Sequence, residues 1–204
     1  MGSRNMHLII ANQVAKKISI SDKSSFLIGG IAPDAVSPKE LSHFFIGEAN
    51  DYTRSIDFDG FLHKYNSIKI EKYILGYYTH LIADDLWLKG FYLPWLKNRI
   101  ESDHHILNLY HQDFELLNGK LLELYGDKDE LKEDLHRRNS ILEIHEVSSN
   151  DVNNLIPHIL KDMNYKEEDV FIDLSVFRLE QIIGYIETCV NKCIMHLKPI
   201  LNLP

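Results

Sequence analysis

The sequence predicts an all-α protein folded as a single-domain helical bundle. Apolar residues recur at the spacing of a helix face over most of the chain. No two runs of alternating apolar and polar residues are joined by an Asn-Gly or Asp-Gly turn, the pattern that would indicate a β-hairpin. The length of 204 residues suits one full-sized hydrophobic core and is short for two. We therefore expect one helical domain over residues 1–204.

The composition is that of a water-soluble globular protein. Hydrophobic residues make up 45% of the chain and charged residues 25%. The formal net charge of −8 argues against a nonspecific binder of long nucleic acid, which would carry a basic face. No apolar run is long enough to span a membrane, and the first residues lack the apolar region of a signal peptide. We expect a cytoplasmic protein, in which Cys189 and Cys193 are reduced core residues.

The first part of the chain is predicted to begin with two helices, and a short helix with Phe58, Phe61, Leu62 and Tyr65 is predicted just before residue 70. Apolar spacing predicts an amphipathic helix over residues 6–18, with Asn5 as its N-terminal cap. A shorter helix follows, with Ser24 or Ser25 in the capping position. The polar segment 50–59 is rich in turn-forming residues and predicts a surface loop.

Longer helices are predicted beyond residue 70. The apolar segments and the caps beside them place these helices in order: a long one over 73–95, a second from Pro94 to about Tyr125, a charged one over 130–138, one capped by Asn150-Asp151 and ending at Met163, and an amphipathic one from Ser175 to Leu197.

The helix over 73–95 carries a pair of metal-ligating residue types. His80 and Asp84 are four residues apart, so they lie one turn apart on the same helix face as Tyr77 and Leu88. That face should point into protein, where a carboxylate is costly unless it is paired or bound to a metal. An imidazole and a carboxylate at this spacing can bind the same cation. A buried His–Asp hydrogen bond that only holds the helix in place is the alternative, and the motif alone favours it.

Further pieces of sequence surround this motif in a fixed order. They are His7, Gly29-Gly30-Ile31-Ala32-Pro33-Asp34, Ser42-His43-Phe44 and Tyr78-Thr79-His80-x-x-x-Asp84. Together they resemble the zinc-dependent phospholipase C family, the all-α superfamily that also contains the fungal single-strand-specific nucleases. The resemblance covers roughly residues 1–115, with the metal-site residues mainly in 7–115.

The resemblance implies a helical bundle of the zinc-dependent phospholipase C type and a set of zinc ligands. Carried over residue by residue, the implied ligands are His7, Asp34, His43, His80 and Asp84. His111 and Glu115 match a later His-x-x-x-Glu ligand pair of the family. Asp34 and Asp84 are also the implied catalytic carboxylates.

The chain departs from the family pattern at two places. Secreted members use their processed N-terminal amine as a zinc ligand, whereas this chain begins Met1-Gly2-Ser3. The family also has a further His shortly after the helical pair, where this chain reads Lys89-Gly90-Phe91. We therefore expect one or two metal ions rather than a cluster of three.

The residue types point to hydrolysis of a phosphoester. Two His and two Asp form a site suited to Zn²⁺ and tolerant of Mn²⁺ or Fe²⁺. Such an ion lowers the pKa of bound water to about 7 and polarises a phosphoryl oxygen. We predict a metal-dependent hydrolase acting on a small phosphoester, without a membrane span. Two alternatives remain: a noncatalytic helical protein with a structural or degenerate metal site, and, ranked lower, a phosphohydrolase of the HD type, because no His is followed by Asp in this chain.

Overall fold

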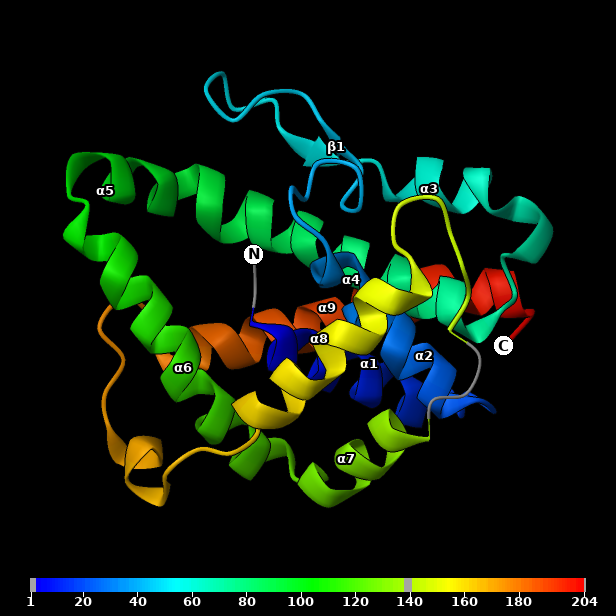
Figure 1. Ribbon diagram of the computed structural model, residues 1–204. Coiled ribbons are helices and arrows are strands. Elements are labelled where there is room, and N and C mark those ends of the chain that lie inside the picture. The colour runs from blue at the N-terminus through cyan, green and yellow to red at the C-terminus, as the bar shows by residue number, and fades with distance from the viewer. Residues whose placement is uncertain (1–2, 138–140, 204) are drawn as a thin grey trace.

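Helices dominate the fold, as the sequence predicts. The computed structural model describes residues 3–137 and 141–203 (Figure 1). The elements in chain order are α1 (Arg4–Lys17), α2 (Lys23–Ile31), η1 (Ala32–Ala35), β1 (Phe45–Ile46), β2 (Ser55–Ile56), α3 (Phe58–Lys64), η2 (Asn66–Ile68), α4 (Lys72–Trp87), η3 (Leu88–Leu96), α5 (Lys97–Ser102), α6 (His105–Tyr125), α7 (Lys128–His136), α8 (Ser149–Asp162), η4 (Glu167–Phe171) and α9 (Leu179–Leu201). The all-α prediction is confirmed. Within the described residues, strand structure amounts to β1 and β2, which pair antiparallel.

The helices begin a few residues away from the predicted caps. Ser3 caps α1 by accepting a hydrogen bond from the Met6 amide, so Asn5 lies inside the helix and is buried. Asp22 caps α2 by accepting from the amide of Ser25. In both cases a capping side chain stood slightly upstream of the residue that apolar spacing suggested. The charged helix predicted over 130–138 is α7, and residue 138 lies outside the described residues.

Helices α2 and α4 cross at very short range. A Cβ atom built on Gly29 would lie 2.0 Å from the carbonyl oxygen of Tyr73, and one on Gly76 would lie 2.0 Å from that of Phe26. Only glycine leaves room for backbones to approach this closely. The crossing therefore fixes α2 against α4, and with it the segment that follows α2.

Helix α4 is the most completely buried long helix of the described chain. Every residue from Tyr73 to Asp85 is buried, and Leu81 is fully so. Helices α1, α2 and α9 all pack against it. A buried helix of this kind is surrounded by protein on all sides, so its polar side chains must find partners inside the core.

The long helix predicted over 73–95 changes its winding near its end. Residues 88–96 form a π-helical segment, η3, which contains Pro94. Proline lacks an amide hydrogen, so the wider segment tolerates it without a chain reversal. The helical winding is interrupted at Asp103, between α5 and α6. The prediction of one helix from Pro94 to Tyr125 is therefore wrong. The surface loop predicted over 50–59 belongs to a β-hairpin, because it contains strand β2. This hairpin projects at the top of Figure 1.

The starts of two helices in the second half of the chain also differ from prediction. The cap of α8 is Ser148, whose side chain accepts from Asp151 in a capping box. The C-terminal helix begins at Leu179, because the buried carboxylate of Asp113 holds the backbone amides of 175–177 in a loop. No sequence pattern indicates this contact between Asp113 of α6 and the segment before α9.

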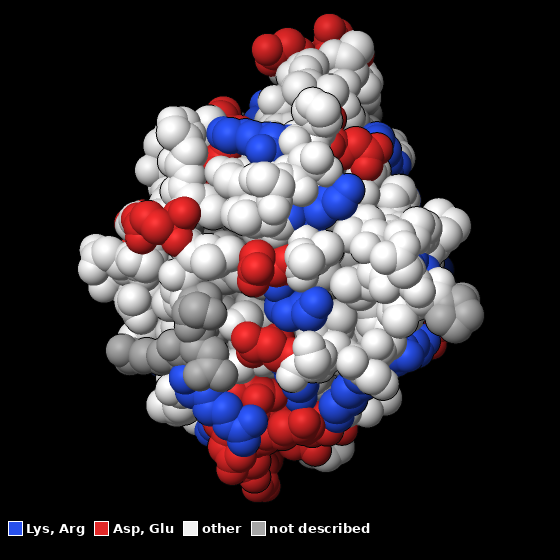
Figure 2. All heavy atoms as spheres, turned by 90° about the vertical axis from the view of Figure 1, so that its right-hand side faces the viewer, with Lys and Arg blue, Asp and Glu red and all other residues white. Residues whose placement is uncertain are grey.

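Charge and hydropathy on the surface are mixed. Lys and Arg side chains are interspersed with Asp and Glu on the face shown in Figure 2. Of the helices in the described part of the chain, none is long and apolar enough to cross a membrane.

Candidate metal centre

Five of the seven predicted ligands meet around helix α4. His80 and Asp84 belong to α4, and His7 lies on α1. Asp34 is on η1, which directly continues the glycine-packed α2, and His43 lies in the turn before β1. All five side chains are buried, with at most 3% of their surface exposed. The α2–α4 crossing thus places Asp34 and the following turn over His80.

Three donor atoms form a small triangle. The Nε2 atoms of His43 and His80 are 3.3 Å apart, and the Oδ2 atom of Asp84 lies 3.2 Å from the first and 3.4 Å from the second. Donors bound to one tetrahedral zinc ion at about 2.0–2.1 Å are about 3.3–3.4 Å from one another. The three edges therefore have the spacing of zinc ligands that share an ion.

Hydrogen bonds outside the triangle fix which histidine nitrogens face inward. Nδ1 of His80 lies 2.9 Å from the carbonyl oxygen of Gly30, which only accepts, so this nitrogen carries the hydrogen. Nδ1 of His43 lies 2.9 Å from Oγ of Ser42, and Nδ1 carries the hydrogen when the Ser42 hydroxyl donates to the Pro33 carbonyl, also 2.9 Å away. In the neutral rings, both Nε2 atoms then present lone pairs to each other and to the Asp84 carboxylate. A cation among the three atoms would remove the repulsion between these lone pairs, as would a proton on Nε2 of His43, whose pKa is raised.

His7 and Asp34 flank the triangle. Nε2 of His7 is 3.2 Å from Oδ1 of Asp84, the oxygen that does not face His43, and its ring stacks on that of His80 with centroids 3.8 Å apart. Oδ1 of Asp34 is 3.6 Å from Nε2 of His43. Donor atoms of His7, Asp34 and His80 lie within 4.8 Å of one another, as do those of His43, His80 and Asp84. Asp84 therefore offers one oxygen to each side of the cluster.

Burial and mutual contact shift the pKa values of these groups strongly. Burial lowers the pKa of His80 to about 4, and the adjacent His7 adds to this, so His80 is neutral at pH 7. Burial opposes a charge on His43 too, but hydrogen bonding to Asp34 and Asp84 outweighs it and raises the His43 pKa. Burial acts to raise the pKa of both carboxyl groups, yet the histidines around them hold it well below the usual range. Both Asp residues are thus anionic at neutral pH.

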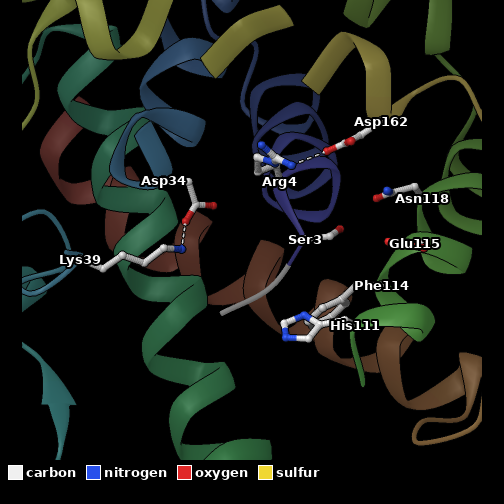
Figure 3. Close-up of a pocket in the computed structure, with 9 residues that line it drawn as sticks. All are labelled: Ser3, Arg4, Asp34, Lys39, His111, Phe114, Glu115, Asn118 and Asp162. Atoms are coloured by element: carbon white, nitrogen blue, oxygen red, sulfur yellow. Dashed lines mark hydrogen bonds and ion pairs between the residues drawn. The ribbon is translucent and has the colours of Figure 1, made fainter. Parts of the chain in front are cut away.

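An open cavity reaches the cluster from one side. It has a volume of about 540 Å³ and meets the cluster at Asp34 (Figure 3). Lys39 lies beside Asp34 and forms an ion pair with it, while Arg4 pairs with Asp162 across the cavity. The cavity is lined by Ser3, Arg4, Asp34, Lys39, His111, Phe114, Glu115, Asn118 and Asp162.

The last two predicted ligands stand on the opposite wall. His111 and Glu115 project from α6 into the cavity and are exposed, outside the two compact groups of donors. Their side chains share the cavity with Asp34 but not the buried cluster. Their role as ligands stays a prediction.

The buried residues fit a metal ion on two further counts. Among the described residues, Nδ1 of His7 and Oδ2 of Asp34 have no hydrogen-bond partner although both atoms are buried. An unsatisfied buried polar atom costs about 1–3 kcal/mol, so an ion that bound these atoms would remove a considerable penalty. The donor set of imidazole nitrogens and carboxylate oxygens is also the one that Zn²⁺ prefers.

Sequence reasoning missed the residues that orient the ligands. Ser42 was noted only as a neighbour of His43, although a hydroxyl next to a ligating His is the available signal. Nothing in the sequence marks Lys39, because its contact with Asp34 depends on how the chain turns between the two.

The chain matches no protein-family model, no curated protein and no solved structure with which it was compared.

Proposed function

We propose that this protein is a metal-dependent hydrolase, with Zn²⁺ as the preferred ion and small phosphoesters as substrates. The observation that carries the proposal is the triangle of His43, His80 and Asp84, in which lone pairs converge at the spacing of zinc ligands. The resemblance to the zinc-dependent phospholipase C family, which rests on the same residues, agrees with it.

The residues divide into two positions. His43, His80 and Asp84, with Asp34 beside them, would hold the first ion, and His7 with the second oxygen of Asp84 would contribute to another position. Zinc bound there would lower the pKa of water to about 7 and polarise a phosphoryl oxygen. Asp34 lies between the cluster and the cavity, so its carboxylate is placed to contact and orient an attacking water.

The cavity supports a small substrate. Its volume of about 540 Å³ is within the range of small-molecule sites. The net charge of −8 disfavours long nucleic acid, because a polyanion is held by closely spaced basic residues. A compact phosphoester, whose single phosphate needs only local positive charge, suits both facts.

A noncatalytic protein with a structural metal site is the second candidate. Complete burial of His43, His80 and Asp84 favours it, since a closed four-ligand site leaves no position for water. The cavity at Asp34 favours the enzyme, because it gives solvent and substrate a path to the cluster.

Metal removal and reloading tests the proposal. Protein treated with a chelator should not hydrolyse p-nitrophenyl phosphate or bis(p-nitrophenyl) phosphate, and reloading with Zn²⁺, Mn²⁺ or Fe²⁺ should restore hydrolysis of at least one. His43→Ala should lose bound zinc and hydrolysis together. The matched control is His63→Ala, at an exposed histidine of α3, which should retain both. Zinc binding without hydrolysis of either ester would favour the structural site.

His7 separates the two metal positions. His7→Ala should abolish hydrolysis while lowering thermal stability less than His80→Ala does, because His80 also bonds the backbone of α2 at Gly30. Full hydrolysis of both esters by His7→Ala would show that the second position is not needed.

A further inference from the structure

Lys39 stands out among the cavity residues because of where its ammonium group lies. Its side chain is 41% exposed in the cavity, while the carboxylate that it contacts, Asp34, is 3% exposed. Lys39 thus links the buried cluster to the open space. Figure 3 shows its side chain extended along the cavity wall with the ammonium group at Asp34.

The backbone of Lys39 is held by the same turn that presents a predicted ligand. The amide of His43 donates to the Lys39 carbonyl at 2.9 Å, and the hydroxyl of Ser42 lies 3.3 Å from it. Lys39 therefore sits on a segment whose geometry is tied to His43. A fixed backbone anchors the base of the Lys39 side chain close to the cluster, which keeps its ammonium group near the cavity end at Asp34.

The charges around the cavity leave Lys39 available for an anionic substrate. Among the described residues, Arg4 and Lys39 are the Lys and Arg side chains that line the cavity, and Arg4 is engaged by Asp162 at 2.9 Å. The partner of Lys39 is Asp34, one of the proposed metal ligands. A carboxylate that shares its charge with a divalent ion attracts a neighbouring ammonium group less strongly. The ammonium group can then turn to an anion in the cavity.

Taking these observations together, we propose that Lys39 binds a nonbridging oxygen of the substrate phosphoryl group and holds the phosphoester against the metal cluster. The inference rests on the proposed function and names its anion-binding residue. Lys39 would then recognise the phosphate that all phosphoesters share, rather than the alcohol to which it is attached.

Inorganic phosphate is the probe, because it contains only the recognised group. Zinc-loaded wild type, Lys39→Met and Lys39→Arg would be compared for zinc content, for phosphate affinity by calorimetry, and for kcat and KM on p-nitrophenyl phosphate. A hydrogen bond to a charged group contributes enough that Lys39→Met should weaken phosphate binding at least about tenfold and raise KM. Zinc content should not change, and Lys39→Arg should recover most of the affinity.

Lys89→Met is the matched control. Lys89 is also a half-exposed lysine paired with a buried carboxylate, that of Asp85, but it does not line the cavity. Its substitution should leave phosphate affinity within about twofold of wild type, well short of the tenfold or greater loss expected for Lys39→Met.

Three results would overturn the inference about Lys39. The first is an unchanged phosphate affinity in Lys39→Met. The second is loss of zinc from that variant, which would show that Lys39 acts through Asp34. The third is the absence of phosphate binding by the zinc-loaded wild type. A wild type that binds zinc and phosphate but hydrolyses no ester would instead refute the proposed function, and the phosphate affinities would still decide the role of Lys39.

Discussion

Replacing one carboxylate oxygen by an amide nitrogen at the centre of the cluster should remove most of the stabilisation that zinc gives. Asp84 is the residue to change, because its two oxygens face the His43–His80 pair and His7 separately. Asp84→Asn keeps the shape of the side chain and removes its charge. The perturbation therefore weakens every proposed metal position at once.

The expected magnitude follows from linkage between binding and folding. At a free zinc concentration of about 1,000 times the dissociation constant, zinc should stabilise the wild type by about 4 kcal/mol. For a chain of this length that is a rise in Tm of about 8–16 °C. Loss of a residue that only orients a ligand weakens metal binding about 10–100-fold, so loss of Asp84 itself should cost at least the upper value. At the same zinc concentration, zinc should then stabilise Asp84→Asn by about 1.4 kcal/mol or less.

Thermal unfolding of metal-free protein, with and without zinc, measures this difference. Asp85→Asn is the matched control: Asp85 is adjacent and equally buried, but it bonds the Ile56 amide and Lys89 instead of the cluster. Its metal-free Tm should fall, while its zinc-induced rise should equal that of wild type. Equal zinc-induced rises in Asp84→Asn and wild type would refute the assignment of Asp84 to a metal site.

Three further predictions concern the fold and its response to pH. Leu81→Ala should cost about 2–5 kcal/mol in urea unfolding, against less than about 0.5 kcal/mol for Leu124→Ala, because the first side chain is fully buried and the second is 53% exposed; similar costs would show that α4 is not central. Gly76→Ala should destabilise by at least about 1–3 kcal/mol because its methyl group would meet a carbonyl of α2, whereas Gly184→Ala, with open space around it, should stabilise by about 0.5–1 kcal/mol; the opposite order would contradict the close helix crossing. The lowered pKa of His80 means that the unfolded chain binds more protons between about pH 6.5 and 4, so metal-free protein should lose stability as pH falls through this window, by at most about 3 kcal/mol; a His80→Gln variant with the same pH profile would exclude His80 as the cause.

The helical fold was predictable because its evidence is local. Apolar residues repeat at 3.6-residue spacing along α1, α4, α6 and α9, and that repeat survives small errors in the caps. The predicted helix boundaries were wrong where tertiary contacts determine where a helix begins or ends. Pro94 is accommodated by a wider helical winding instead of a turn, and α9 starts late because Asp113, far away in sequence, holds its leading segment. Neither effect leaves a periodic signal.

The candidate site was partly predictable for a different reason. His80 and Asp84 form a pair that helix geometry alone brings together, and the other members were named from a resemblance. The orientation of the donors could not be foreseen, because it depends on the Gly30 carbonyl and the Ser42 hydroxyl. The pairing of Lys39 with Asp34 likewise depends on the path of the turn between η1 and β1.

The position of the cluster argues against stability as the reason for its residues. Asp84 and His80 occupy the most buried helix, where apolar side chains of similar volume would pack without the cost of desolvating charge. The glycines at the α2–α4 crossing add a second cost, since glycine within a helix is less stable than alanine, and they are needed to bring Asp34 and the Gly30 carbonyl up to His80. Two independent departures from the most stable sequence therefore converge on one point of the core. Departures of this kind from the most stable sequence are expected at functional sites, and a bound cation would satisfy the facing nitrogens and the carboxylates together.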